Sequence, residues 1–349
     1  KNSEPEALLA DVDRLAKIKM LEKENKILTE QNSPDSDIFL KSKSPAYRDL
    51  LETCRQIADS DINVLLLGES GVGKEVAANL IYRMSSRKNG PFVKVNCAAI
   101  PKELMESEFF GYEKGAFTGA KESGKEGYFA IADGGVLLLD EVGEMPLELQ
   151  AKLLRAIQEG EFYPVGGRKP IRVDVRILAS TNRNLIQMVQ DGEFREDLYY
   201  RLNVVSLKIP ALAERTEDIP LLANHLLRQA AERHKPFVRA FSTDAMKRLM
   251  TASWPGNVRQ LVNVIEQCVA LTSSPVISDA LVEQALEGEN TALPTFVEAR
   301  NQFELNYLRK LLQITKGNVT HAARMAGRNR TEFYKLLSRH ELDANDFKE

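Results

Sequence analysis

Short apolar runs alternate with longer stretches of helical periodicity over the first part of the chain. The runs are Val64–Leu67, Phe92–Asn96, Val136–Leu139, Val173–Ala179 and Val204–Leu207. An alternation of strands and helices predicts a parallel sheet with helices on both faces. We therefore expect an α/β domain over residues 38–209.

The pattern changes at Pro210. From there to residue 290 only helical periodicity remains, and Trp254-Pro255-Gly256-Asn257 predicts a turn before a helix. A linker at Glu289–Pro294 then leads into residues 291–349, where three further helices are predicted: Phe296–Ile314, Val319–Met325 and Asn329–Arg339. We expect a helical lid over residues 210–290 and a separate helical domain after it.

The first 37 residues predict a helix and a linker. Glu6–Gln31 is helix-forming, and its apolar positions form a stripe with one slip in the heptad count: Leu8, Val12, Leu15, Ile18, Leu21 and Leu28. Two interpretations stay open, a short dimerising helix or an amphipathic helix packed on its own domain. Asn32–Asp37 is the predicted linker.

Composition limits the classes of protein and partner. With 349 residues, 43% of them hydrophobic, the chain can form two or three domains. No apolar run approaches the roughly 20 residues of a membrane span, so we expect no membrane partner and a cytoplasmic location. The net charge is −3, so nucleic-acid binding would require a local basic surface. Cys54, Cys97 and Cys268 are widely spaced, which favours reduced, buried thiols.

A phosphate-binding loop follows the first predicted strand. Its residues are Gly68, Glu69, Ser70, Gly71, Val72, Gly73, Lys74 and Glu75. The glycines let backbone N–H groups converge on a polyphosphate, the helix predicted at Val76–Met84 directs its positive end at the same anion, and Lys74 adds a full charge. A glycine-rich turn without a ligand is the alternative, which the flanking strand and helix disfavour. We expect a nucleoside triphosphate.

Two carboxylates end a later apolar strand. Asp140 and Glu141 follow Val136–Leu139, at the predicted carboxyl edge of the sheet. We expect Asp140 to hold Mg²⁺ and Glu141 to orient the attacking water. The general phosphate loop ends in Ser or Thr, whose hydroxyl binds magnesium, but here Glu75 occupies that position. Either other groups hold the metal, or the loop belongs to a branch that has replaced the hydroxyl.

Between these motifs lies a loop of small residues around one aromatic. It contains Gly115, Ala116, Phe117, Thr118, Gly119 and Ala120. From the residues alone it is either a flexible surface loop or a loop that inserts Phe117 into a partner. The hexapeptide resembles the signature loop of bacterial enhancer-binding proteins, the AAA+ P-loop ATPases that activate sigma-54 RNA polymerase. The resemblance extends from Ser44 to the C-terminus and accounts for Glu75, because the family's loop normally ends in Gly-Lys-Glu.

The resemblance implies roles for further residues. It identifies Asn96 as a switch partner that holds Glu141 until the nucleotide state or a partner contact releases it. It identifies Thr181 and Asn182 as the sensor of the γ-phosphate, and Arg259 as the lid arginine. Arg195 and Arg201 match arginine fingers, which reach the site of a neighbouring subunit, although singly each could be an ordinary surface cation. The family forms a hexameric ring. It binds ATP and Mg²⁺, and its response regulators carry an N-terminal phospho-receiver that a histidine kinase addresses. Because the chain starts at Lys1 without a methionine, we expect such a domain to precede it.

The last three predicted helices have helix-turn-helix spacing. Residues expected to contact enhancer DNA are Arg328, Asn329, Arg330, Thr331, Tyr334, Lys335 and Arg339. The local excess of cations suits phosphate binding, although a solvated helical bundle has the same pattern. The region resembles the family's Fis-type domain, and it departs from that pattern at Arg328 and Glu332.

The features together indicate a DNA-binding activator that hydrolyses ATP to remodel sigma-54 polymerase, with self-association into dimers and rings. A small-molecule kinase would share the phosphate loop but would leave residues 115–120 and the basic tail unexplained. A repressor with a structural nucleotide site would bind ATP without turnover, which Glu141, Arg195 and Arg201 argue against.

Overall fold

The computed structural model describes residues 41–116, 124–289, 296–340, 342 and 344–347. Contacts divide the chain into two compact units between Ala285 and Leu286, a little before the boundary predicted at residue 290. The helix predicted over Glu6–Gln31 and residues 117–120 of the small-residue loop lie outside the described residues.

The first unit contains a five-stranded parallel sheet in the order β2-β3-β6-β1-β7. The strands are β1 (Val64–Leu67), β2 (Phe92–Asn96), β3 (Val136–Asp140), β6 (Arg176–Thr181) and β7 (Val205–Lys208). The register pairs Asn96 with Asp140 and Leu67 with Thr181. Because all five strands are parallel, the phosphate loop, the two carboxylates and the predicted sensor leave the sheet at the same edge.

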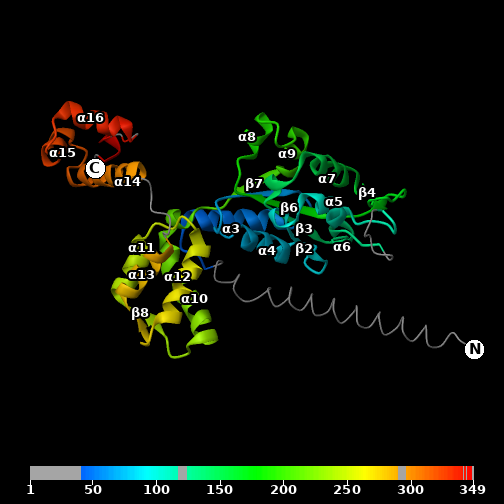
Figure 1. The fold of residues 1–349 in the computed structure, drawn as a ribbon, viewed down its shortest axis with the longest axis horizontal. Helices are drawn as coiled ribbons and strands as arrows, with labels where there is room; N and C mark the ends of the chain where they lie inside the picture. Colours follow the sequence, from blue (N-terminus) through cyan, green and yellow to red (C-terminus); the bar gives the residue numbers. More distant parts are fainter. Residues whose placement is uncertain (1–40, 117–123, 290–295, 341, 343, 348–349) are drawn as a thin grey trace, which may run out of the picture. The chain divides into compact units, whose positions relative to one another are not determined.

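Alternate residues of each strand pack on opposite faces of the sheet. Leu65 of β1 belongs to one apolar cluster, whereas Val64 and Leu66 belong to another. The first face is covered by α5 (Lys102–Phe110), α6 (Tyr128–Ile131), α7 (Leu147–Glu159), α8 (Leu185–Gln190) and α9 (Glu196–Leu202); the second is covered by α3 (Pro45–Ala58) and α4 (Lys74–Met84) (Figure 1). The predicted doubly covered parallel sheet is confirmed.

One strand boundary was predicted wrongly. Val173–Val175 lies outside β6, and the Val173 N–H donates to the Gly160 carbonyl at 2.8 Å, beside the antiparallel hairpin of β4 (Glu161–Phe162) and β5 (Ile171–Arg172). The continuous apolar run Val173–Ala179 therefore has two pairing partners: Val173 bonds to Gly160 beside the hairpin, and the residues from Arg176 onward pair within the sheet. Two short turns follow the sheet edge, η1 (Cys97–Ala99) after β2 and η2 (Val142–Glu144) after β3.

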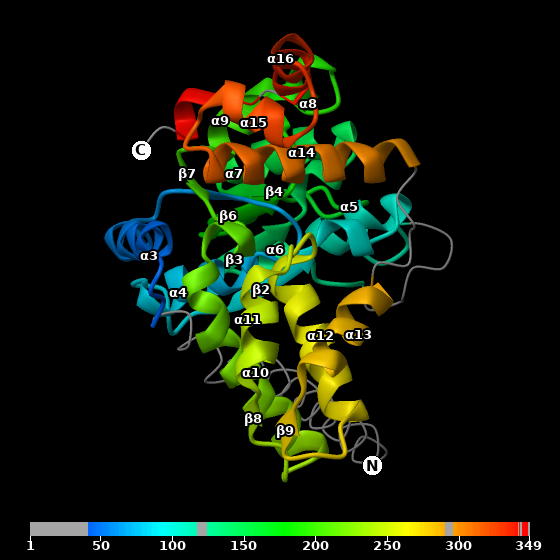
Figure 2. The ribbon, with the colours of Figure 1, turned by 90° about the vertical axis from the view of Figure 1, so that its left-hand side faces the viewer.

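The lid is the helical part of the first unit (Figure 2). It comprises η3 (Leu212–Glu214), η4 (Thr216–Asp218), α10 (Ile219–His234), α11 (Thr243–Thr251), α12 (Asn257–Leu271) and α13 (Asp279–Glu289), which runs past the boundary at Leu286. The prediction of helices alone needs correction, because β8 (Ala240–Phe241) pairs in parallel with β9 (Val276–Ile277). Two-residue strands satisfy the backbone of two loops but are too short to produce a sequence period.

The second unit has three helices, α14 (Phe296–Ile314), α15 (Val319–Met325) and α16 (Arg330–Arg339), followed by η5 (Ala344–Phe347). Its buried core includes Leu308, Leu312, Phe333 and Leu337. In neither unit do the described residues contain a helix that is both long and apolar enough to span a membrane. All three cysteines are buried and free, as predicted.

Candidate nucleotide site

The phosphate loop connects β1 to the N-terminus of α4. Gly71 and Gly73 have φ angles of 78° and 103°, in the left-handed region that other residues rarely adopt. A Cβ on Gly71 would lie 2.4 Å from the carbonyl oxygen of Gly256 in the lid. Glycine is therefore required at position 71 both for its backbone angle and for the close approach of the lid.

Lys74 is the buried cation of this loop, with only 7% of its side chain exposed. Its Nζ donates to the carbonyl oxygens of Gly68 at 3.0 Å and Glu69 at 3.3 Å, and lies 3.3 Å from Oε1 of Glu141. The ammonium group is thus fixed at the centre of the loop. Any anion that binds there competes with Glu141 for it.

The two predicted catalytic carboxylates are held differently. Asp140 accepts a hydrogen bond from the hydroxyl of Ser180 on the neighbouring strand. Glu141 has φ 52° and ψ 52°, and its Oε2 accepts from the backbone N–H of Asn182 at 3.1 Å. A left-handed conformation costs a non-glycine residue about 1–2 kcal/mol, and such strain is concentrated at functional sites.

In this structure Asn96 and Glu141 have other partners, so the predicted switch contact between them stays a prediction. Asn96 Oδ1 instead accepts from the N–H of Ala98 at 2.9 Å and so caps η1. Glu141 is held by Lys74 and by the backbone of Asn182. An amide at a strand end can cap the following turn, and that local bond competes with the longer reach to the glutamate.

The predicted sensor lies at the carboxyl end of β6. Thr181 is buried, and its Oγ1 accepts from the N–H of Arg183 at 3.0 Å. Asn182 is exposed and contributes its backbone to Glu141. The predicted sensor loop therefore contacts Glu141, the predicted catalytic glutamate, through the main chain.

The donor set near Asp140 fits Mg²⁺ only together with a nucleotide. Glu75 is 61% exposed and pairs with Lys94 at 2.8 Å. Over the part of the chain that the structure describes, three or more His, Cys, Asp or Glu side chains nowhere gather as a metal site. Magnesium commonly binds one or two carboxylates plus phosphate and water oxygens, which is what Asp140 beside a phosphate loop provides.

The lid contacts the phosphate loop directly. Asn257 is fully buried with φ 52°, and its Nδ2 donates to Glu69 Oε2 at 2.9 Å and to the Ser70 carbonyl at 3.1 Å. The Val258 N–H donates to the Gly71 carbonyl at 3.0 Å. The predicted lid arginine, Arg259, is exposed and donates to the Ser70 hydroxyl at 2.7 Å. The lid and the loop thus form one hydrogen-bonded assembly.

Sequence reasoning missed Asn257 and Arg215. Arg215 is fully buried, donates from Nη2 to the Val72 carbonyl at 2.6 Å, and lies 4.4 Å from the ring centroid of Tyr47. The turn before α12 was a signal for Asn257, but its partners in the phosphate loop were not apparent. For Arg215 the sequence offered no signal.

The two predicted arginine fingers belong to α9 and its N-terminus. Arg195 forms a two-pronged pair with Asp197, Nε to Oδ1 at 3.0 Å and Nη2 to Oδ2 at 2.7 Å. The guanidinium holds the pKa of the Asp197 carboxyl below its usual range. Arg201 is exposed, and its Nη2 donates to the Ile157 carbonyl at 3.4 Å. The two guanidinium groups thus bond to Asp197 on α9 and to Ile157 on α7, rather than to the phosphate loop.

The small-residue loop begins from a fixed base. Tyr112 bridges to Lys125 and to Val165, and the Glu113 N–H donates to the Val165 carbonyl at 3.0 Å. Gly115 has φ 76° and has no atom within 4 Å of an added Cβ. The described part of the loop is therefore rooted on the segment that joins β4 to β5.

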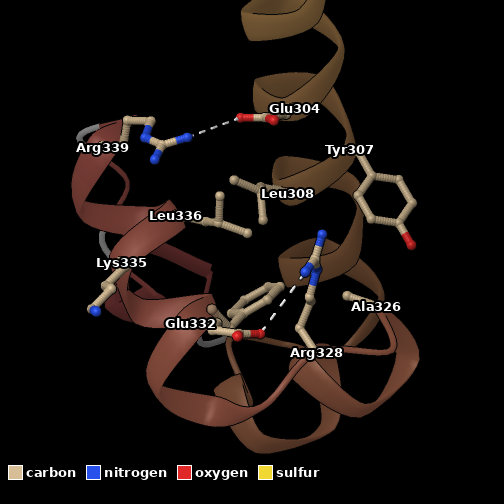
Figure 3. Close-up of a pocket in the computed structure, with 10 residues that line it drawn as sticks. Glu304, Tyr307, Leu308, Ala326, Arg328, Glu332, Lys335, Leu336 and Arg339 are labelled. Carbon is tan, nitrogen blue, oxygen red and sulfur yellow. Dashed lines mark ion pairs between the residues drawn. The ribbon is translucent and has the colours of Figure 1, made fainter.

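In the second unit all seven predicted DNA contacts are exposed. Asn329 caps α16 by accepting from the Glu332 N–H at 2.8 Å, and the Arg330 guanidinium lies 5.7 Å from the Tyr334 ring centroid. Figure 3 shows Arg328 directed toward Glu332 and Arg339 directed toward Glu304. The N···O distances of these pairs are 3.9 Å and 3.7 Å, and the four residues line a cavity of about 620 Å³. The unit presents cations, two of which are loosely paired.

Comparisons with known proteins agree with this geometry. The profile of the Sigma-54 interaction domain matches residues 40–208, and that of the AAA+ ATPase lid domain matches residues 213–296. Over 324 residues the chain is 72% identical to the transcriptional regulatory protein GlrR of Escherichia coli K12, covering 92% of this chain and 73% of GlrR.

Solved structures of NtrX from Brucella abortus are also similar. Its complex with ADP has a TM-score of 0.68 and 37% identity, covering 95% of this chain and 75% of NtrX. Its complex with ATP has a TM-score of 0.66 and 37% identity, covering 98% and 77%.

Proposed function

The chain belongs to the sigma-54-dependent transcriptional regulators of the NtrC type, which are AAA+ ATPases, and we propose that it hydrolyses ATP as an oligomeric ring to remodel sigma-54 RNA polymerase and open promoters. Both residues 40–208 and residues 213–296 match domains of this family. The remaining steps of the proposal concern the site, the ring and the partners.

Within one subunit, the loop and the two carboxylates divide the chemistry. Lys74 and the backbone N–H groups of the loop bind the β- and γ-phosphates, and Glu141 orients water for attack. Asp140 would hold Mg²⁺, which offsets phosphate charge when it is bound. Glu141 must first leave its pair with Lys74, 3.3 Å away. Arg259, on the lid, already contacts Ser70 of the loop and is placed to follow the nucleotide state.

The position of the arginines carries the ring proposal. Arg195 and Arg201 contact groups of α7 and α9 in their own subunit, and exposed guanidinium groups can be supplied to a neighbour. An arginine finger supplied in trans raises phosphoryl-transfer rates by roughly 10³–10⁵-fold. The complete site is therefore shared between adjacent subunits.

Two surfaces connect hydrolysis to transcription. Residues 115–120 would contact sigma-54 polymerase, and Phe117 would insert into it. The exposed cations of α16 and of the turn before it would bind enhancer DNA as a helix-turn-helix. A receiver domain that a histidine kinase addresses would regulate assembly, and dimers would precede the ring.

Mixing two inactive variants tests the shared site. Arg195→Ala lacks a finger but keeps its own catalytic residues, whereas Glu141→Gln keeps the finger and cannot activate water. For randomly mixed rings with one heterologous interface per site, an equal mixture should regain about a quarter of parental activity. The parental specific activity should also rise with protein concentration. A mixture as inactive as its components would contradict a shared site and favour a self-contained ATPase.

The contact with polymerase is tested separately. Thr118→Ala should change ATP hydrolysis by less than about twofold, since a contact made to polymerase takes no part in phosphoryl transfer, while open-promoter formation should be abolished. Equal loss of both activities would rule out this division of labour.

A further inference from the structure

The arginine-finger segment is tied to the catalytic carboxylate segment of its own subunit by a buried glutamine. Gln150, on α7, is 0% exposed. Its Nε2 donates to the Met145 carbonyl at 2.8 Å and to the Glu193 carbonyl at 3.1 Å, and its Oε1 accepts from the Arg195 N–H at 2.8 Å. Both donors and the acceptor of this amide are used.

A second connection runs outside the first. Arg183, next to the sensor, donates from Nη1 to the Gly143 carbonyl at 3.2 Å and from Nη2 to Glu193 Oε2 at 2.8 Å. Its Nη1 also lies 3.6 Å from Glu144. The guanidinium therefore bridges the turn that follows Glu141 and the residue two positions before Arg195.

Both connections begin and end on the same two segments. One segment is Gly143–Met145, which begins two residues after Glu141, and the other is Glu193–Arg195. A buried amide with all of its hydrogen bonds made holds its neighbours in one arrangement, because losing any of these bonds leaves a buried polar group unpaired. The finger segment cannot move without disturbing the chain beside Glu141.

We propose that Gln150 and Arg183 are positioning residues, which anchor the finger that a subunit offers to its neighbour on that subunit's own catalytic loop. The proposal rests on the shared site described above. It gives a physical route by which the nucleotide state of one site alters the next site in the ring: displacement of Glu141 by nucleotide moves Gly143–Met145, and the two bridges carry that movement to Arg195.

The mixing experiment separates this role from a merely structural one. In the mixture of Arg195→Ala with Glu141→Gln, the first variant is the acceptor of a finger and the second is its donor. Arg183→Ala, introduced into the donor alone, should lower the recovered turnover number about fivefold, within the range typical of coupling networks, with the ATP KM changed by less than twofold. The same change introduced into the acceptor alone should have little effect.

Two controls sharpen the result. Arg55→Ala removes an exposed arginine of α3 that pairs with Glu52 at 3.2 Å, and in the donor it should leave recovery unchanged. Glu193→Ala in the donor should reproduce the loss, and the double variant with Arg183→Ala should lose no more than either alone, because the two side chains act through one contact. Gln150→Met tests the buried bridge, with retained ATP binding as the check on folding.

The outcomes distinguish the two proposals. If the unmodified mixture regains activity but Arg183→Ala acts equally in donor and acceptor, or only in the acceptor, the positioning role is wrong and the shared site stands. If the unmodified mixture regains none, the shared site itself fails and the positioning role fails with it.

Discussion

The phosphate loop and the terminal helices use polar side chains in opposite ways. Around the loop, Lys74, Asn257 and Arg215 are buried and bonded to main-chain carbonyl groups. On α16 and in the turn before it, the predicted DNA contacts are exposed, and Arg328 and Arg339 reach their acidic partners only at 3.9 Å and 3.7 Å. One region depends on fixed geometry and the other on charge.

This difference determines how each region should respond to substitution. A buried polar group has one set of partners, and removing it leaves the others unpaired. An exposed cation contributes only part of the electrostatic attraction that it and its neighbouring cations exert together, and salt screens that contribution. We therefore expect large, local losses in the first region and small, additive, salt-dependent losses in the second.

Lys74→Ala should give the largest effect. Loss of a preorganised charge that faces the transferred phosphate typically costs about 10²–10³-fold in rate, and ATP affinity should fall as well. Steady-state hydrolysis and binding of a fluorescent ATP analogue measure the two losses. Lys94→Ala, which removes a cation paired with the exposed Glu75, is the matched control and should stay within about threefold of the parent, as expected for a surface pair. If Lys74→Ala hydrolyses ATP at a rate within tenfold of the parental rate, the expectation of large losses around the phosphate loop is wrong.

Asn257→Ala should have the next largest effect, on stability and on nucleotide binding together. The change leaves the Leu212 N–H, 2.7 Å from Oδ1, without its partner, and it removes both bonds to the loop. We expect the free energy of unfolding to fall by about 1–3 kcal/mol and the ATP KM to rise. Urea denaturation and steady-state kinetics measure these changes.

A matched exposed asparagine provides the control for that experiment. Asn224 is exposed, and its Nδ2 donates to the Pro220 carbonyl of its own helix at 2.7 Å, so Asn224→Ala should be nearly neutral. If both variants lose the same stability, burial at position 257 is not what makes the lid contact strong.

The helices and strands could be predicted from the sequence where their periodicity is strong. The sheet and the terminal helices have strong periodicity, so their elements were predicted to within a few residues. β8 and β9 were missed because two residues have no period. Val173–Val175 was misassigned because an apolar run does not reveal where one pairing partner replaces another.

The site was predictable where its residues are contiguous in the chain. The loop and the pair Asp140-Glu141 were placed at the sheet edge correctly, because parallel strands bring their carboxyl ends together. Asn257 and Arg215 were missed because their partners lie 187 to 188 and 143 positions away. The sequence also did not show that Asn96 Oδ1 accepts from the nearby Ala98 N–H, and the contact of Asn96 with Glu141 stays a prediction.

Arg330→Ala examines the charge-dependent side of the comparison. Removing one phosphate-binding cation should weaken DNA binding several-fold at all sequences and reduce the slope of log affinity against log salt by about 1. Fluorescence anisotropy over a salt series measures the slope, and ATP hydrolysis should not change. An unchanged slope, or a loss confined to particular sequences, would show that Arg330 reads bases rather than supplying charge.

The smallest expected effect concerns an ion pair that is less buried than the groups around the phosphate loop and less exposed than the cations of the terminal helices. Arg87, whose side chain is 12% exposed, donates to both carboxylate oxygens of Asp61 at 2.8 and 3.1 Å, and to Asp174. These bonds hold the pKa of Asp61 below its usual range. A lowered folded-state pKa contributes stability that is complete above the ordinary value of about 3.9 and is lost as the pH falls through the lowered value. Because the Asp61 side chain is 59% exposed, the contribution is small.

The unfolding midpoint of the parent should therefore exceed that of Asp61→Asn by a few degrees at most at pH 6, and the difference should shrink toward zero below about pH 4. Thermal unfolding from pH 7 to pH 3 measures it. A difference that persists unchanged at pH 3 would mean that Asp61 acts through packing or hydrogen bonding that the neutral amide cannot supply, and would place this pair with the geometry-dependent groups of the phosphate loop.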